Sequence, residues 1–311
     1  MILIVASNPA IDRTLHVPVL EPGRVHRPRE VHLGAGGKGL NVARAIRVLG
    51  HPCRLTGCLA GHTGDLVADL AREEGLEADW HRLPRGETRN CMLLNHDQGD
   101  ATVINEPGPV LQAGDWDGFA RKVEGLAGAA RGVVLAGSVP PSVDPEAYAG
   151  LCRSLARRVG RVWVDSPGPP LAAILRDPRG LSLKVNRFEL SEALGRALDD
   201  PGRLLAALRA VIGAGAALAG VTLGPEGALL ATADGAWRVE APATRLVSSV
   251  GSGDSFLAGL AVAWDQEWGV PDSLRLAAAC GAANAESPYP ARFRADQVQG
   301  LFQRCRAEPL G

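Results

Sequence analysis

Short apolar runs alternate with amphipathic helical segments along most of the chain, and this alternation limits the folds open to it. The apolar runs, which we predict to be strands, are residues 2–5, 54–59, 133–136, 162–165, 182–184 and 218–223. Helical spacing of apolar residues occurs in segments 39–49, 66–74, 116–127, 145–157 and 203–212, and then in 252–268, 272–286 and 295–304. Strands that alternate with helices pair in parallel and are covered on both faces, so we predict an α/β fold with a mostly parallel central sheet.

Two segments interrupt this alternation, residues 8–33 and 86–106. Both are extended and rich in turn residues, and neither has helical spacing. We predict that they form a small β-sheet that covers a ligand pocket as a lid. No low-complexity linker divides the chain, so residues 1–311 are expected to form a single domain with these lid segments inserted.

The composition excludes several classes of function. The chain has 311 residues and a formal net charge of −1, which gives no electrostatic basis for binding nucleic acid or an anionic membrane. Its apolar stretches are too short to span a bilayer, and the apolar residues 1–5 lack a basic lead-in, so we predict a buried first strand there and no signal peptide. Six widely spaced cysteines without a C-x-x-C motif predict reduced thiols, no zinc site and a cytoplasmic location.

The run VGSGDSF, residues 250–256, is a glycine turn that opens a helix. The free N–H groups of a first helical turn and the positive end of the helix dipole favour an anion. Asp254 suits a simple capping role, but Gly251 and Gly253 on either side of Ser252 do not improve a cap and instead allow close approach to the backbone. A phosphoryl group in transfer, with Asp254 accepting the proton of the attacking hydroxyl, uses every one of these residues.

A second glycine turn, GAGGKGLNVAR at residues 34–44, also enters a helix. Its spacing matches neither the Walker A loop nor the Rossmann fingerprint. A merely flexible loop would leave Lys38 and Asn41 unexplained. Gly36 and Gly37 would instead let a sugar lie against the backbone while Asn41 bonds to its hydroxyls.

These two motifs, in this order and near the two ends of the chain, resemble those of the ribokinase-like carbohydrate kinases, also called the PfkB family. Four further segments carry the resemblance: NPAID at 8–12, ETRN at 87–90, GSVP at 137–140 and KVNRFE at 184–189. The resemblance covers essentially the whole chain and implies a ribokinase-like three-layer sandwich whose lid also mediates homodimers. It is greatest to the phosphosugar branch, which contains 1-phosphofructokinase, tagatose-6-phosphate kinase and the minor bacterial 6-phosphofructokinase.

The resemblance implies a sugar-phosphate site. Its substrate-binding residues would be Asp12, Arg24, Gly36, Gly37, Lys38, Asn41, Arg89 and Ser138. Arg89 and Arg24 would bind the phosphate that is not transferred, because a guanidinium bonds to phosphate through two N–H groups, and Ser138 would donate to the same phosphate. The alternatives are a turn aspartate at position 12 and a solvated arginine at position 24.

A nucleotide site is implied in the same way. Its ATP-binding residues would be Lys184, Asn186, Thr222, Gly224, Gly227 and Asn284. Asn186 and Glu189 share one helix face and are suited to Mg²⁺, although a helix cap formed by the same pair is an alternative that is compatible with this role. Asn284 is either an adenine contact or a polar residue at a helix end. Ser249 and Ser252 stand where the family more commonly has threonine and alanine.

These features predict ATP- and Mg²⁺-dependent phosphorylation of a ketohexose phosphate. Fructose 1-phosphate is the expected acceptor and fructose 1,6-bisphosphate the product. Tagatose 6-phosphate and fructose 6-phosphate remain alternatives, because the fructofuranose ring is nearly two-fold symmetric and one phosphate pocket with Arg89 serves either orientation. A non-catalytic sensor of sugar phosphates or nucleotides is the alternative from another class, but it would not need to keep Asp254, Asn186 and Glu189.

Overall fold

A ten-stranded sheet forms the centre of the protein in the computed structural model, which describes residues 1–97 and 99–310. The strand order is β14-β13-β12-β11-β10-β9-β8-β1-β4-β5. The strands are β1 (Ile2–Ala6), β4 (Cys53–Leu59), β5 (His81–Arg82), β8 (Gly132–Ala136), β9 (Val162–Asp165), β10 (Leu181–Asn186), β11 (Leu218–Thr222), β12 (Ala228–Thr232), β13 (Gly235–Val239) and β14 (Ala307–Leu310). All neighbours from β5 to β11 are parallel, which confirms the predicted mostly parallel sheet.

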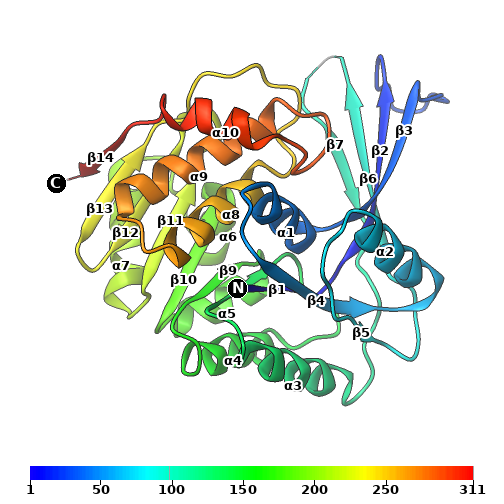
Figure 1. Cartoon of the computed structure of the whole chain (residues 1–311), viewed down its shortest axis with the longest axis horizontal. Coiled ribbons are helices and arrows are strands. Elements are labelled where there is room, and N and C mark those ends of the chain that lie inside the picture. Colours follow the sequence, from blue (N-terminus) through cyan, green and yellow to red (C-terminus); the bar gives the residue numbers. More distant parts are fainter. Residues whose placement is uncertain (98, 311) are drawn as a thin grey trace.

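Helices cover both faces of this sheet and make three layers (Figure 1). Side chains alternate along β1, so that Ile2 and Ile4 contribute to one buried core while Leu3 and Val5 contribute to the other. The first core includes α1 (Lys38–Val48), α2 (Gly61–Glu73), α8 (Ser252–Asp265), α9 (Val270–Ala285) and α10 (Ala295–Phe302). The second includes α3 (Asp115–Ala127), α4 (Pro145–Ala156), α5 (Pro169–Arg176), α6 (Arg187–Leu194) and α7 (Pro201–Gly213). The predicted three-layer α/β sandwich is therefore confirmed.

Local sequence signals set several helix boundaries. Asp144 caps α4 by accepting a hydrogen bond from the N–H of Glu146, and Asp200 caps α7 by accepting one from Arg203. In both helices proline stands in the first turn, where its missing N–H costs no hydrogen bond. These caps explain why α7 begins at Pro201, two residues before the predicted start.

The sequence-based prediction missed one edge of the sheet. β12 and β13 form an antiparallel hairpin after β11, and β14 adds to β13 from the chain's last residues. β14 lies beyond the last helical segment predicted from the sequence, residues 295–304. Pairing of β14 depends on a partner far back in the sequence, so no local pattern identified it.

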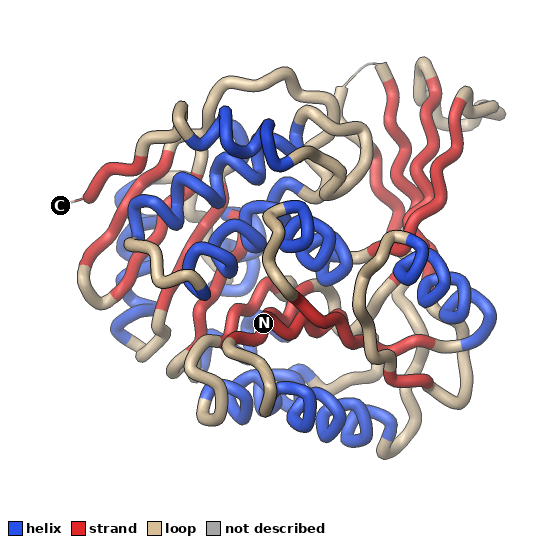
Figure 2. Tube along the Cα trace, in the orientation of Figure 1, coloured by secondary structure: helices blue, strands red, loops and turns tan. Residues whose placement is uncertain are grey.

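The lid is a separate four-stranded sheet with the order β3-β2-β6-β7 (Figure 2). Its strands are β2 (Ala10–Val17), β3 (Glu30–Gly36), β6 (Arg89–His96) and β7 (Thr102–Asn105). They lie in the two predicted lid segments, except that β3 continues to Gly36. The outward face exposes apolar residues, with Val31 58% and Ile104 54% accessible.

All six cysteines lie within the described residues, and each has a free thiol. Among the helices that the structure describes, none combines the length and the apolarity needed to cross a bilayer.

Candidate active site

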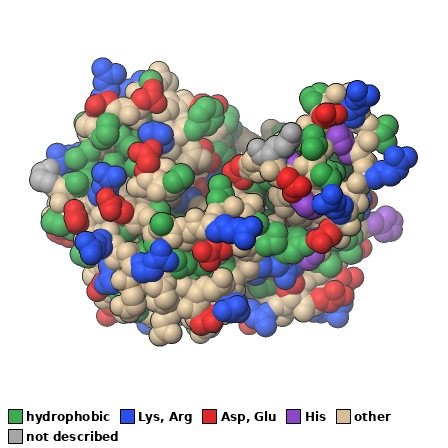
Figure 3. Space-filling view, turned by 90° about the horizontal axis from the view of Figure 1, so that it is seen from above, with side chains coloured by type: hydrophobic (Ala, Val, Ile, Leu, Met, Phe, Trp, Pro, Cys, Tyr) green, Lys and Arg blue, Asp and Glu red, His purple; other side chains and the backbone are tan. Residues whose placement is uncertain are grey.

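A cavity of about 1150 Å³ opens between the lid and the carboxyl ends of the central strands. Figure 3 shows the surface hollowed between the main body and the lid. Ligands in open α/β sheets bind at this edge. The lining includes these predicted site residues: Asp12, Gly37, Lys38, Asn41, Arg89, Ser138, Lys184, Asn186, Glu189, Thr222, Gly224, Gly227, Gly251, Ser252, Gly253 and Asp254.

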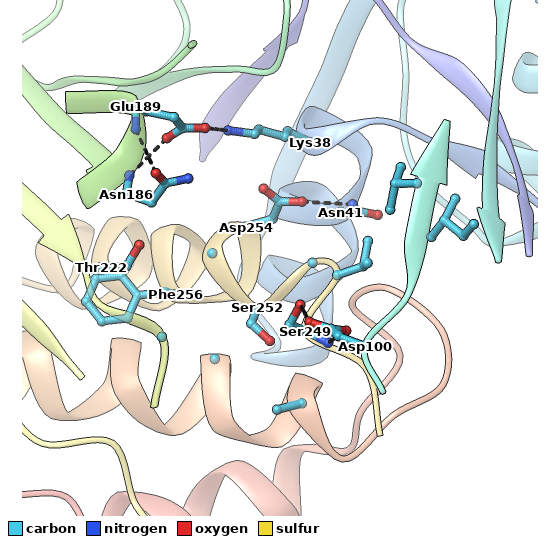
Figure 4. A pocket seen from close by; sticks show the side chains of 18 of the residues that line it. Lys38, Asn41, Asp100, Asn186, Glu189, Thr222, Ser249, Ser252, Asp254 and Phe256 are labelled. Carbon is cyan, nitrogen blue, oxygen red and sulfur yellow. Dashed lines mark hydrogen bonds and ion pairs between the residues drawn. The ribbon is translucent and has the colours of Figure 1, made fainter. Parts of the chain in front are cut away.

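Asp254 lies in the first turn of α8, and side chains from α1 hold its carboxylate in place. Asn41 Nδ2 donates to Asp254 Oδ2 at 2.8 Å (Figure 4). Arg44 Nη1 donates to Asn41 Oδ1 at 2.9 Å, so the amide of Asn41 can present only its N–H groups to Asp254. The predicted sugar-binding residue Asn41 therefore also orients the predicted base.

Two carboxyl groups in this cavity, Asp254, which is buried, and Asp12, which is partly buried, have raised pKa values. Burial raises the pKa of Asp254 to about 6, although Lys38 acts in the opposite direction. Burial likewise raises the pKa of Asp12 to about 6, although Arg44 opposes the shift. A carboxyl group with a pKa near neutrality is matched to accepting and releasing a proton.

Lys38 and Lys184 share one buried carboxylate, Asp165, at the end of β9. Lys38 Nζ lies 2.6 Å from Asp165 Oδ1, and Lys184 Nζ lies 2.6 Å from Asp165 Oδ2. Burial alone would raise the pKa of Asp165, but the two lysines hold it below its usual value. Asp165 thus pairs with both lysines at the cavity wall, where their side chains can neutralise an anion.

Close approaches explain two of the glycines. A Cβ atom on Gly36 would lie 2.0 Å from Asp12 Cγ, so glycine at position 36 leaves room for the Asp12 carboxylate. A Cβ atom on Gly253 would lie 2.7 Å from Lys184 Nζ. Glycine at position 253 therefore lets the lysine ammonium lie against the start of α8, where unpaired N–H groups already favour an anion.

Arg89 stands at the lid side of the cavity. Its Nε donates to the carbonyl of Asn8 at 3.1 Å, and its Nη1 donates to the carbonyl of Glu106 at 3.1 Å. Asn8 Nδ2 lies 3.2 Å from Ser138 Oγ, so one residue links the arginine to the Ser138 turn. The remaining guanidinium N–H groups do not bond to these two carbonyls and can donate hydrogen bonds to a ligand phosphate.

Asn186 and Glu189 form a reciprocal cap at the start of α6. The Glu189 N–H donates to Asn186 Oδ1 at 2.8 Å, and the Asn186 N–H donates to Glu189 Oε2 at 2.9 Å. This confirms the capping alternative. Glu189 Oε1 also lies 3.1 Å from Lys38 Nζ, and the described residues contain no group of three or more metal-binding side chains. The Asn186–Glu189 pair could therefore bind Mg²⁺ only together with water molecules and nucleotide phosphates. Mg²⁺ commonly binds in this way.

Three predicted site residues do not line the cavity. Arg24 lies in the β2–β3 connection, outside the cavity lining, with its side chain 75% exposed and 3.8 Å from Glu21, which fits the alternative of a solvated arginine. Gly36 acts only by making room for Asp12. Asn284 is fully buried and hydrogen-bonded to protein groups, which favours the alternative of a polar residue at a helix end.

The sequence did not reveal two polar residues of the site. Asp165 ends a predicted strand at the carboxyl edge of the sheet, and that position was the available signal for it. Asp100, between β6 and β7, accepts hydrogen bonds from the N–H of Ser249 at 3.2 Å and from its hydroxyl (Figure 4). This contact brings the lid against the segment that leads into the α8 turn.

Comparison with known proteins assigns the family. The sequence profile of the pfkB family carbohydrate kinases matches residues 4–294. The chain belongs to this family. It is therefore a carbohydrate kinase, a phosphotransferase.

Relatives of this kinase include phosphofructokinases. A 1-phosphofructokinase from Xanthomonas campestris pv. campestris is 35% identical over 302 residues, which cover 96% of this chain and 95% of that protein. The structure of phosphofructokinase-2 from Escherichia coli in complex with substrates and products is 26% identical, with a TM-score of 0.89 over 97% of this chain and 98% of that one. A possible 1-phosphofructokinase from Thermotoga maritima shares the fold, with a TM-score of 0.90, 23% identity and full coverage of both chains.

Proposed function

We propose that this kinase transfers the γ-phosphoryl group of ATP to fructose 1-phosphate and forms fructose 1,6-bisphosphate. The observation that carries the proposal is Arg89, which provides a second anion-binding group on the lid side of the cavity, apart from the α8 turn. A kinase for free sugars has no need of a second phosphate contact. The similarity to a 1-phosphofructokinase over nearly the full length of both chains supports the same acceptor.

The chemical step would begin when Asp254 accepts the proton of the sugar hydroxyl. The hydroxyl oxygen then bonds to the γ-phosphorus as the bond between that phosphorus and the ADP oxygen breaks. Asn41 keeps the Asp254 carboxylate directed by its 2.8 Å hydrogen bond. Asp12 would bind the sugar hydroxyls, and Arg89 with Ser138 would hold the phosphate that the sugar already carries.

Negative charge on the transferring group would be balanced by residues of this chain. Lys38 and Lys184 line the cavity together with Gly251, Ser252 and Gly253, and unpaired N–H groups in the first turn of α8 would act with the two lysines. Mg²⁺ would enter with ATP, and Asn186 and Glu189 would face it through water. When bound, the ion supplies additional neutralisation of the phosphate charges.

A specific observation also favours fructose 6-phosphate as the alternative acceptor. The structure of Escherichia coli phosphofructokinase-2 in complex with fructose-6-phosphate has a TM-score of 0.87 and 25% identity to this chain. Steady-state kinetics with fructose 1-phosphate, fructose 6-phosphate and tagatose 6-phosphate distinguishes the three acceptors. A higher kcat/KM for either 6-phosphate would contradict the proposed acceptor.

Replacing Arg89 with alanine tests the phosphate contact. We expect Arg89→Ala to lower kcat/KM for fructose 1-phosphate by a factor that corresponds to a loss of about 2–5 kcal/mol in transition-state stabilisation. The loss arises because one partner of a partly buried charge pair is removed. The already poor rate on free fructose should hardly change, since free fructose has no phosphate for the guanidinium. Kinetics on both sugars is the measurement.

Arg85→Ala is the matched control for that experiment. Arg85 is exposed, lies four residues earlier and does not line the cavity, so its removal should leave both rates unchanged. A general folding defect in Arg89→Ala would depress both rates equally. Equal efficiency of the wild type on fructose and fructose 1-phosphate would refute the phosphosugar assignment.

The pH dependence of kcat/KM should reveal the raised carboxyl pKa values. Asp254 must be ionised to accept a proton, and its pKa is about 6, so kcat/KM should fall as the pH decreases through about 6. Asp12 titrates in the same range, so the fall of kcat/KM at low pH should be steeper than one titrating group would give. A profile that stays flat down to about pH 5 would contradict Asp254 as the base. In the Asp12→Asn variant, kcat/KM should still fall at low pH, but with a shallower slope.

The requirement for Mg²⁺ should depend on Glu189. We expect Glu189→Gln to raise the Mg²⁺ concentration needed for half-maximal rate, because the carboxylate supplies the negative charge of the Asn186–Glu189 face. Rates measured across a Mg²⁺ titration at fixed ATP test this expectation. An unchanged midpoint would leave Glu189 with only its capping role in α6.

Two further expectations stay predictions. A homodimer through the lid would cover the exposed outward residues Val31 and Ile104, and an exposed sheet face of this kind is normally covered. The cytoplasmic location rests on the sequence and the family alone.

A further inference from the structure

Asn284, which does not line the cavity, is hydrogen-bonded to the glycine turn before α8. Its side chain lies in the last turn of α9 and is fully buried. Asn284 Nδ2 donates to the Val250 carbonyl and to Ser252 Oγ, both at 2.9 Å. Its Oδ1 accepts from the N–H of Ala291 at 2.6 Å.

These contacts allow only one orientation of the Asn284 amide. A peptide N–H can only donate, so the Ala291 side requires the amide oxygen. A peptide carbonyl can only accept, so the Val250 side requires the amide nitrogen. The group that faces Ser252 is therefore an N–H donor, independent of how the side-chain amide is assigned.

The direction of the Ser252 hydroxyl follows from this arrangement. Ser252 Oγ accepts the N–H of Asn284 with a lone pair, so its own proton cannot point toward Asn284. In the described part of the chain, Asn284 is the one side-chain or backbone group that hydrogen-bonds to Ser252 Oγ. Ser252 lines the cavity, so the hydroxyl proton is available to an acceptor there.

Other donors converge on the same region. Ser252 is the first helical residue of α8, and although its own N–H donates to the Ser249 carbonyl at 3.1 Å, the first turn of a helix leaves further N–H groups without helical acceptors. The space beside Gly253 is filled by Lys184 Nζ. A phosphoryl group has only acceptor oxygens, so it complements a hydroxyl donor placed between these groups.

We infer that the Ser252 hydroxyl donates a hydrogen bond to the phosphoryl group during its transfer, and that Asn284 fixes the direction of this hydroxyl. The inference rests on the proposed phosphoryl transfer and adds a side-chain donor to the backbone groups of the turn. Ser252 would then be a catalytic residue, whereas Asn284 would be a positioning residue that acts through it.

Ser252→Ala tests the hydroxyl. We expect kcat to fall between about 10-fold and 100-fold, because losing one preorganised donor costs up to about 10²–10³-fold and the lysines and backbone donors remain. Affinity for ADP with fluoroaluminate, which imitates the phosphoryl group in transfer, should fall by a similar factor. Affinity for ADP alone, measured by calorimetry, should stay the same, because the group in transfer is absent.

Ser255→Ala is the matched control. It removes a buried hydroxyl from the same helix, but Ser255 Oγ donates to the Gly251 carbonyl at 2.9 Å and does not line the cavity. We expect its kcat to stay near the wild-type value. A kcat of Ser252→Ala within about threefold of wild type, or an equal loss in Ser255→Ala, would overturn the inference.

Asn284→Asp tests the positioning role with almost no change in shape. One carboxylate oxygen still accepts from the Ala291 N–H, while the other loses the bond to the Val250 carbonyl and becomes an acceptor that draws the Ser252 proton away from the cavity. We expect a loss of kcat, and we expect Ser252→Ala in this background to cause no further loss. Losses that multiply would overturn the role of Asn284. If Asn284→Asp fails to fold, the comparison of Ser252→Ala with Ser255→Ala still decides the inference.

The wild-type measurement separates this inference from the proposed function. A wild-type enzyme that phosphorylates none of the three sugar phosphates would overturn both. A wild-type enzyme that is active on one of them, with Ser252→Ala equally active, would overturn only the role of Ser252.

Discussion

Asp254→Asn should abolish most turnover and at the same time stabilise the protein at neutral pH. The base contributes about 10²–10⁴-fold to the rate, and an amide cannot accept the proton. The pKa of Asp254 rises from 3.8 to about 6 on folding, mainly through burial, and this shift corresponds to about 3 kcal/mol of destabilisation above pH 6. Assays of kcat and urea unfolding at several pH values are the measurements.

The sign of the pH effect follows from the direction of the shift. Because the folded state holds the Asp254 proton more tightly than the unfolded state does, the wild type loses stability as the pH rises from 3.8 through about 6. Asp254→Asn lacks this titration, so its advantage should be largest above pH 6 and smaller at about pH 5. More than a tenth of the wild-type kcat in this variant would contradict the role of Asp254.

Asp272→Asn is the matched control for this substitution. Asp272 is an exposed aspartate in the first turn of α9, where it pairs with Arg275 at 2.8 Å. Its replacement should cost about 0.3–1 kcal/mol, because a favourable interaction with the helix dipole is lost. If the free energy of unfolding rises in Asp254→Asn and falls in Asp272→Asn, the burial of Asp254, and not the acid-to-amide change itself, is the cause of the gain in stability.

Asp165→Asn should destabilise the protein by about 3–5 kcal/mol, because it leaves a buried cation without its counter-charge. The side chain of Lys184 is only 4% exposed, and Asp165 is its ion-pair partner at 2.6 Å. Lys38 would retain Glu189 at 3.1 Å. The free energy of unfolding in urea is the measurement.

Glu189→Gln is the comparison variant, because it removes the other carboxylate beside Lys38 while Asp165 still pairs with both lysines. We expect it to cost clearly less than Asp165→Asn. The lysines hold the pKa of Asp165 below its usual value, so the stability that Asp165 provides is present above pH 3.8 and is lost as the pH falls below that value. A cost of Asp165→Asn below about 1 kcal/mol would show that the fold tolerates Lys184 unpaired.

Local chemistry made part of this molecule predictable. The Asn186–Glu189 cap is formed by residues three positions apart, and it occurs where the sequence predicted it. The two glycine turns and the alternation of strands and helices likewise depend on residues close together in the chain. Asp12, Arg89, Lys184 and Asp254, which sequence motifs predicted as site residues, line one cavity in the structure.

The contacts that give these residues their properties were not predictable in this way. Asn41 and Asp254 are 213 positions apart, and Lys38 and Asp165 are 127 apart, so no sequence period relates them. From the sequence, Asp165 is only a polar residue at the end of a predicted strand. The structure shows that its two carboxylate oxygens pair with Lys38 and Lys184. The sequence left Asn284 open between a nucleotide contact and a polar residue at a helix end, and its hydrogen bond from the Ala291 N–H joins residues that no local pattern relates.

The sequence by itself determined which backbone segments become strands, helices and anion-binding turns, because hydrogen bonding and side-chain periodicity act over a few residues. Only the tertiary structure decided the hydrogen-bond partner and the burial of each polar side chain. Those two properties set the pKa of Asp254, the charge around Lys184 and the direction of the Ser252 hydroxyl, because each depends on groups that the fold brings together from distant parts of the chain.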